Sequence, residues 1–466
     1  MVSANPFPDV LADRYASAAM VHVWSPEGKV IAERHLWVAV LKTQQELGVD
    51  VPAGVVEAYQ AVQDQVDLES IRQRELVTRH DVKARIEEFC ALAGYEHIHK
   101  AMTSRDLTEN IEQLQIRRSL VLVRSKLLAL ICALGKRAEQ YADLVMVGRT
   151  HNVAAQATTF GKRMANLGTE AIAGLQRVED VLSRYQFRGI KGPVGTQQDI
   201  LDLLDGDSSK AHVLENRVAA ELGFTEVLNS VGQVYPRSLD YEVTSALVQA
   251  SSAPANLAKA IRLMAGQGLV SEGFQAGQVG SSAMPGKRNT RTCERICGLA
   301  AVLHGYCQMV SSLLGDQWNE GDVSCSVVRR VALPGAFLAL DGQLEAALVV
   351  LNELQVFEDD IASELQENMA ALSATRVLLA AVARGVGRER AHSIVAEHVP
   401  KGKGFFAAVA VDSRLALCGS DMQQIRADPV MLTGAAVAQA QAFARQAGKL
   451  AAENPESVHY LPESIL

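Results

Sequence analysis

The sequence predicts an all-α protein built around a bundle of long helices. Hydrophobic residues make up 48% of the 466 residues and aromatic residues only 5%, so the apolar content is mainly Ala, Leu and Val, which suits helices. No proline occurs between Pro52 and Pro193, so 140 consecutive residues contain no obligate helix breaker. Within this stretch apolar residues recur at alternating steps of four and three, at Ile116, Leu120, Val123, Leu127, Leu130 and Leu134.

The spacing of these residues predicts one helix from about 106 to 141, packed along its whole length. Similar helical periodicity covers four further segments, at about 156–186, 237–268, 290–315 and 328–356. None of the periodic segments shows the alternating Val and Ile residues, bounded by tight turns, that are typical of strands. The centre of the chain is therefore predicted to be a bundle of several long helices.

Gly-rich segments punctuate this pattern and are predicted to be long loops, at 189–199, 272–290 and 399–404. Short helices are expected before residue 105 and after about residue 360. Together these features divide the chain into an N-terminal helical domain (1–105), a central helical bundle (106–360) and a C-terminal helical domain (361–466).

The charge balance excludes a broad basic surface. The chain has 45 Lys and Arg against 53 Asp and Glu, a formal net charge of −8, so neither nucleic acid nor a membrane surface is an expected partner. No apolar run reaches the roughly 18 residues of a membrane span, and the first residues lack the order of a secretory signal. A cytoplasmic location is expected, and any anionic ligand must find locally clustered cations.

The seven cysteines are scattered without a paired framework, which fits reduced thiols. Cys293, Cys297 and His304 could lie on one helix face as metal ligands, but no fourth ligand follows at a usual spacing. Small residues in a buried helical seam are the favoured interpretation. No metal and no cofactor are therefore expected.

The loop GSSAMPGKRNT at 280–290 concentrates reactive groups. It is not a P-loop, because five residues separate Gly280 from Gly286 and Arg288 rather than Ser or Thr follows Lys287. A solvated interhelical loop is the default interpretation for a Ser-Ser pair. Two hydroxyls, two cations and an amide in one loop instead favour a functional site.

Three other segments gather polar groups, at 78–85, 103–110 and 148–159. Each has a simple structural interpretation: Arg79 and Asp81 as a surface pair, Thr103 as a helix N-cap, and His151 as a capping imidazole. The functional alternative for a Thr-Ser pair at a helix start is anion binding, because free N–H groups and the positive end of the helix dipole favour a carboxylate.

Taken together, these motifs resemble those of a known family. GSSAMPGKRN, with RHDVKA, TSRDLTEN, GRTHNVAAQATTFGKR and FRGIKGPVGTQ, is similar to the signature segments of the adenylosuccinate lyases, within the fumarase/aspartase superfamily. The resemblance extends from Arg14 and Tyr15 to beyond residue 380 and is weak over the last 65 or so residues. It implies an all-α homotetramer of three-domain protomers, whose long helices merge into a twenty-helix core and whose active sites are each assembled from three subunits.

The resemblance also implies a reaction, the non-hydrolytic elimination of fumarate from adenylosuccinate and from succinylaminoimidazole carboxamide ribotide in purine biosynthesis. By similarity Ser281 is the base and His151 the general acid. His80, His99, Lys287 and Glu294 match further catalytic or supporting positions. The positions that match substrate-binding residues are Arg14, Tyr15, Arg79, Asp81, Thr103, Ser104, Gln233, Ser282, Asn289, Arg295, Ser326 and Arg330.

Four residues depart from the family pattern: Asn152 after the acid, Gly286 and Thr290 in the loop, and Gly321, where many relatives have an arginine. The Gly286 version of the loop also occurs in fumarases. A different fumarate-forming lyase, such as a fumarase or an argininosuccinate lyase, is therefore the nearest alternative. A non-catalytic helical oligomer that retains the fold is a further one.

Overall fold

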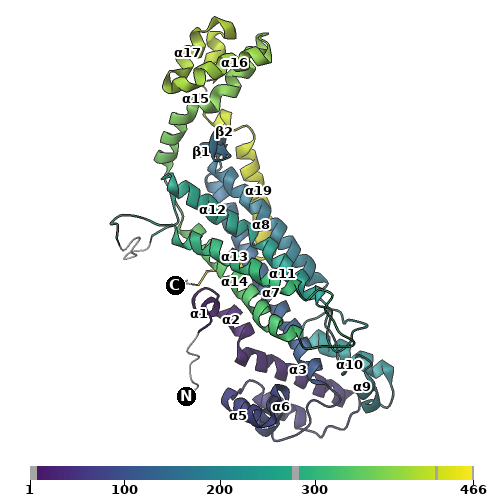
Figure 1. Cartoon of the computed structure of the whole chain (residues 1–466). Helices are drawn as coiled ribbons and strands as arrows, with labels where there is room; N and C mark the ends of the chain where they lie inside the picture. Colours follow the sequence, from purple (N-terminus) through teal and green to yellow (C-terminus); the bar gives the residue numbers. More distant parts are fainter. Residues whose placement is uncertain (1–7, 275–282, 426–428, 464–466) are drawn as a thin grey trace.

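The computed structural model describes residues 8–274, 283–425 and 429–463, and the statements below refer to these residues. The chain is elongated, with a long central bundle and smaller groups of helices at its two ends (Figure 1). The bundle consists of α7 (Ser104–Gln140), α8 (Phe160–Ser183), α11 (Ser238–Ala250), α12 (Ser252–Gly266), α13 (Arg291–Ser311) and α14 (Cys325–Glu353). The predicted all-α fold class is thus confirmed.

The 37-residue helix α7 is the axis of the bundle and matches its predicted range closely. It begins at a capping box in which Thr103 and Asp106 satisfy each other's backbone N–H groups. The six apolar positions that predicted it are all at most 1% exposed. Because α3, α8, α14 and α19 surround it, α7 is buried on more than one face.

The N-terminal helices lie at one end of the bundle: α1 (Val10–Arg14), α2 (Ala18–Trp24), α3 (Pro26–Glu46), α4 (Val55–Val62), α5 (Leu68–Thr78) and α6 (Asp81–Ala93). Two helices from the middle of the chain, α9 (Gln198–Leu203) and α10 (Ser208–Glu221), lie at the same end, where α10 packs on α3.

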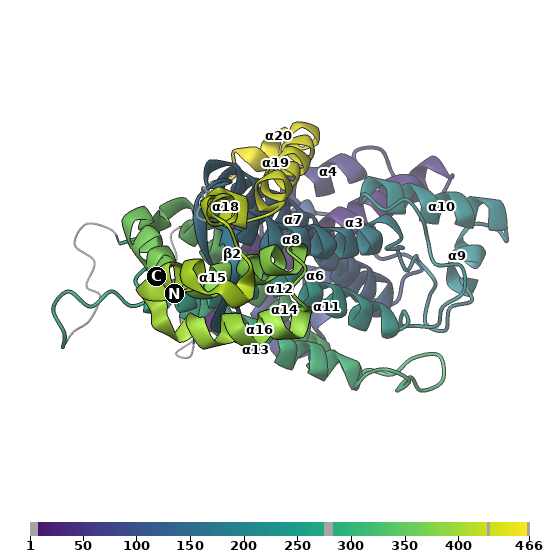
Figure 2. The same ribbon diagram turned by 90° about the horizontal axis from the view of Figure 1, so that it is seen from above.

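The opposite end carries a helical group with its own small apolar core. It contains α15 (Glu358–Ala383), α16 (Arg388–His398), η1 (Val399–Gly404), α17 (Phe405–Val411), η2 (Ser413–Leu415), α18 (Gly419–Ile425) and η3 (Pro429–Leu432). The chain then returns: α19 (Ala436–Glu453) packs on α7 and α8, and α20 (Pro455–Val458) packs on α7 (Figure 2).

Several predictions of local structure were wrong. Residues 156–159 belong to a hairpin of β1 (Val145–Thr150) and β2 (Val153–Thr159), and a second small sheet pairs β3 (Val270–Ser271) with β4 (Gln355–Val356). The segment 237–268 is interrupted at Ser251, and 399–404 forms the 3-10 helix η1 rather than a loop. The terminal groups also contain long helices, since α3 has 21 residues and α15 has 26.

The length and composition of one described helix, α14, would suffice to cross a membrane, with a mean hydropathy of 1.4 over 18 residues. This helix was predicted at about 328–356, but not as a possible membrane span, because polar residues interrupt its apolar run. However, 89% of that window is buried within the protein. The apolar character of α14 is accounted for by its place in the core of the bundle.

Candidate active site

The start of α7 is fixed by a buried aspartate. The Thr103 N–H donates to Asp106 Oδ2 at 2.8 Å. The other oxygen, Oδ1, accepts from the Arg188 guanidinium at 2.6 Å and from the backbone N–H groups of Lys191 and Gly192 at 2.9 and 3.0 Å. The FRGIKG segment is therefore tied to the helix end that presents Thr103 and Ser104.

A second group reaches the same end of the bundle from the N-terminal helices. His80 caps α6, with Nδ1 accepting from the Lys83 N–H at 3.3 Å. Asp81 Oδ2 accepts from Arg85 at 2.9 Å and lies 3.8 Å from Arg330 Nη2 in the second turn of α14. Burial raises and Arg85 lowers the pKa of Asp81, with a net downward shift, so its carboxylate is ionised. The fold thus brings Arg330 to the RHD motif.

His99 lies in the loop between α6 and α7. Its Nδ1 accepts a hydrogen bond from Trp37 Nε1 at 3.0 Å, so the neutral ring carries its proton on Nε2. Burial lowers the pKa of His99 to about 4, although nearby Asp106 acts in the opposite direction. His99 is therefore a neutral imidazole at pH 7.

Gln233 and the segment before α14 pack tightly together. The Gln233 N–H donates to the Glu320 carbonyl at 2.6 Å. A Cβ atom on Gly321 would lie 2.6 Å from Gln233 Cβ, so a side chain at position 321 would require this segment to move. Ser326, in the first turn of α14, donates its hydroxyl to the Val323 carbonyl at 2.8 Å.

Beneath these residues lies a buried network of charges that sequence reasoning missed. Glu109 pairs with Arg237 at 2.7 Å, and Arg329 pairs with Asp240 at 2.8 Å and also with Glu112. All five side chains are at most 12% exposed. The signal in the sequence was the spacing of acidic residues by three along the apolar helix at 106, 109 and 112.

A separate region, the β1–β2 hairpin, carries His151. Thr150 pairs with Val153, so His151 and Asn152 are the two central turn residues, with φ values of 52° and 62°. Two positive φ values define a type I′ hairpin, in which asparagine is favoured. The Asn152 departure from the family pattern therefore has a conformational cause.

The hairpin is held against α15. Arg149 Nη2 lies 2.5 Å from Glu364 Oε1, and these side chains are 24% and 14% exposed. Apolar residues of the hairpin, Val145 and Val147, pack in one cluster with Leu365 of α15. His151 itself is exposed at the tip of the turn.

A third region is the loop that leads into α13. Ser281 and Ser282 lie outside the described residues. Lys287 is exposed, and Gly286 has a φ of 80°, where a side chain would be strained. The loop exit is fixed by buried Glu272, which sequence reasoning also missed. Its carboxylate accepts from the N–H groups of Thr292 and Cys293, both at 2.9 Å.

The other predicted residues of this region lie at the end of the loop and the start of α13. Asn289 is half-buried just before α13, whereas Glu294 and Arg295 lie in the first turns of that helix, Glu294 exposed and Arg295 half-buried. Burial beside Glu272 strongly raises the pKa of the Cys293 thiol, so this cysteine stays protonated.

Arg14 and Tyr15 end α1, where Arg14 is exposed and Tyr15 rests on α14. Arg79 ends α5 in the left-handed conformation, with a φ of 51°, and is exposed next to His80. The predicted residues therefore fall into separate regions: one end of the bundle, the middle of α14 where α1 packs, the His151 hairpin near the other end, and the loop before α13 (Figure 1).

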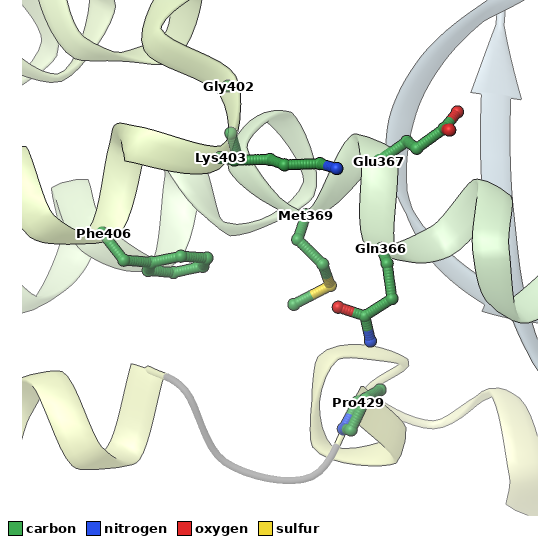
Figure 3. A pocket seen from close by; sticks show the side chains of 8 residues that line it. Gln366, Glu367, Met369, Gly402, Lys403, Phe406 and Pro429 are labelled. Carbon is green, nitrogen blue, oxygen red and sulfur yellow. The ribbon is translucent and has the colours of Figure 1, made fainter.

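A cavity of about 420 Å³ lies in the C-terminal helical group, between α15, η1, α17 and η3 (Figure 3). Met369 and Phe406 form its apolar wall, and the Lys403 ammonium extends across it toward Glu367. None of the predicted site residues within the described ranges lines this cavity.

Comparison with known proteins agrees with this fold and these motifs. A family model described as Lyase matches residues 12–305. The fumarate lyase from Mesorhizobium sp. BNC1 superposes with a TM-score of 0.79 at 22% identity, covering 93% of this chain and 98% of that one. The 3-carboxy-cis,cis-muconate lactonizing enzyme from Pseudomonas putida superposes with a TM-score of 0.81 at 19% identity, covering 95% and 100%. The fold and motifs thus define a lyase of the fumarase/aspartase type.

Proteins with higher sequence identity to this chain show which family of lyases it belongs to. The chain is 33% identical over 393 residues to the adenylosuccinate lyase of Schistosoma mansoni, covering 83% of this chain and 82% of the relative. It is also 33% identical over 391 residues to the adenylosuccinate lyase of Saccharomyces cerevisiae, covering 82% and 80%. The chain belongs to the adenylosuccinate lyase family.

Proposed function

We propose that this protein eliminates fumarate from adenylosuccinate, giving AMP, and from succinylaminoimidazole carboxamide ribotide, giving the carboxamide ribotide. The observation that carries the proposal is the family match over more than four-fifths of the chain. The approach of Arg330 to Asp81, at the same end of the bundle as Thr103 and Ser104, supports it, because the substrate carries a phosphate and two carboxylates.

In this reaction a base removes a Cβ proton, the Cβ electrons form the new double bond, and the C–N bond breaks toward nitrogen. We assign the base to Ser281 and the acid that protonates the departing nitrogen to His151. Lys287 stabilises the serine alkoxide, and Ser282 contacts substrate beside it. A positioned acid or base contributes about 10²–10⁴ in rate. No cofactor is required.

The other residues divide between the two halves of the substrate. Thr103 and Ser104 bind the succinyl carboxylates through the N-terminus of α7. Cations bind the nucleotide and its phosphate, at Arg14, Arg79 and Arg330, with Tyr15, His80, Asp81 and Ser326 beside them. Gln233, Asn289, Glu294 and Arg295 complete the site, and neutral His99 supports the acid.

We further propose a cytoplasmic homotetramer, with protomer domains 1–105, 106–360 and 361–466, whose active sites each combine regions of three subunits. The separation of these site regions along one chain supports this arrangement. Exposed apolar residues on α13 and α14 support it too, since Val302, Val327 and Val331 are 41%, 72% and 50% exposed. Nucleic acid and membranes are not proposed as partners.

The test is fumarate release, followed by its ultraviolet absorbance. Purified protein should release fumarate from adenylosuccinate and not from argininosuccinate or malate. Ser281→Ala should abolish turnover while AMP still binds and the oligomer persists. Preference for argininosuccinate or malate would overturn the substrate assignment, and near-normal activity of Ser281→Ala would exclude Ser281 as the base.

A further inference from the structure

A buried charge cluster that the proposed chemistry does not use lies between α7 and α14. Lys126 of α7 is 2% exposed, and its ammonium pairs with Asp341 and, at 2.7 Å, with Glu345, both fully buried on α14. Two buried carboxylates face one ammonium, so their remaining lone pairs need further donors.

Those donors come from two segments at opposite ends of the sequence. The Ser17 N–H donates to Asp341 Oδ2 at 2.7 Å, and Ser17 Oγ accepts from Lys126 at 2.8 Å. The Tyr460 hydroxyl and the Glu463 N–H both donate to Glu345, the latter at 2.6 Å. The cluster therefore ties residues near 17 to residues 460–463.

The two segments also contact each other directly. Glu463 Oε2 accepts from the N–H of Ala18, the first residue of α2, at 3.0 Å. A carboxylate at this position favours the helix start. The segment reaches this place along α7, where Asn454 accepts from Arg124 at 3.0 Å and Ser457 Oγ lies 3.3 Å from Ser125 Oγ.

The same structure fixes Arg14 and Tyr15. Tyr15 lies two residues before Ser17, and its backbone rests on Gly342, the neighbour of Asp341. A Cβ atom on Gly342 would lie only 2.7 Å from the Tyr15 carbonyl oxygen. Movement of the cluster would therefore move the end of α1.

We propose that residues 460–463 form a latch that positions Arg14 and Tyr15 and thereby sets the affinity for the nucleotide half of the substrate. Tyr460 and Glu463 are then positioning residues that do not touch substrate. This inference rests on the proposed function, which assigns Arg14 and Tyr15 to the nucleotide.

The test compares Tyr460→Phe/Glu463→Ala, which removes the hydroxyl donor to Glu345 and the side-chain acceptor of the Ala18 N–H, with Glu456→Gln, which removes an exposed charge from the same stretch of chain. The double variant should raise KM for adenylosuccinate and weaken inhibition by AMP about tenfold, with kcat within about twofold and inhibition by fumarate unchanged. Glu456→Gln should match the wild type.

Unchanged KM and unchanged inhibition by AMP in the double variant would contradict the latch. Equal weakening of inhibition by AMP and by fumarate would contradict it too. If the double variant does not fold, Tyr460→Phe alone should still weaken inhibition by AMP more than inhibition by fumarate. An equal effect on both would contradict the inference. A wild-type protein that does not cleave adenylosuccinate would instead refute the proposed function. In that case backbone hydrogen exchange at residues 14–20 should still be faster in the double variant than in the wild type. Unchanged exchange would contradict the latch as well.

Discussion

At the scale of single residues, His99 shows how burial sets a protonation state. Its ring accepts a hydrogen bond from Trp37, and burial lowers its pKa to about 4. Between pH 4 and 6.5 the folded protein therefore keeps His99 neutral, whereas an exposed histidine would be mostly protonated. A Gln at this position could still accept from Trp37 but could not titrate. The contribution of His99 can therefore be isolated by one substitution.

Because the folded pKa lies below the ordinary value of about 6.5, the unfolded state binds more protons between pH 6.5 and 4. His99 should therefore cost up to about 3 kcal/mol of unfolding free energy as the pH falls through this window. Urea unfolding of wild type and His99→Gln should be measured at pH 7, 5.5 and 4.5. The unfolding free energy of the variant should fall less steeply with decreasing pH than that of the wild type. Identical slopes would contradict a buried neutral His99.

Residue-scale departures from the family pattern could be listed from the sequence but explained only by the structure. Asn152 and Gly286 occupy positive φ values, and Gly321 makes room for Gln233. The structure supplies no reason for Thr290. The partners of Glu109 could not be predicted, because Arg237 and Arg329 are 128 and 220 residues away in the chain.

At the scale of elements, long helices were predictable and short strands were not. The start and end of α7 were predicted to within about two residues, because its apolar positions recur over many turns. The strands β1 and β2 have six and seven residues and lack a clean alternation of burial. The second half of β2, residues 156–159, was therefore assigned to the following helix, and the strands on either side of His151 were not predicted.

The attachment of this hairpin to α15 yields a test. Glu364→Gln removes the charge that holds Arg149, and a small displacement of a catalytic group costs up to about 10²-fold in rate. We expect kcat to fall about 10- to 100-fold with KM within about twofold. Glu367→Gln, an exposed position on the same helix, is the matched control.

The charge exchange Arg149→Glu/Glu364→Arg should recover part of the lost rate. Equal activity of Glu364→Gln and wild type, or a loss confined to KM, would show that the ion pair does not position His151.

At the scale of the whole molecule, the structure separates the regions that carry the proposed catalytic residues. The His151 hairpin lies near one end of the bundle, the start of α7 with Thr103 and Ser104 lies at the other end, and the described residues just before α13 lie between them (Figure 1). A symmetric oligomer with elongated protomers can bring different ends of different chains together. The net charge of −8 is compatible with a small anionic substrate, because the cations need to converge only at such a junction.

The most direct test of this central claim is subunit complementation. Ser281→Ala and His151→Ala chains, each inactive alone, are mixed under conditions in which subunit exchange is verified with labelled chains. If base and acid come from different subunits, about a quarter of the sites in an equal mixture should contain both intact residues and recover activity. No recovery after confirmed exchange would contradict shared active sites.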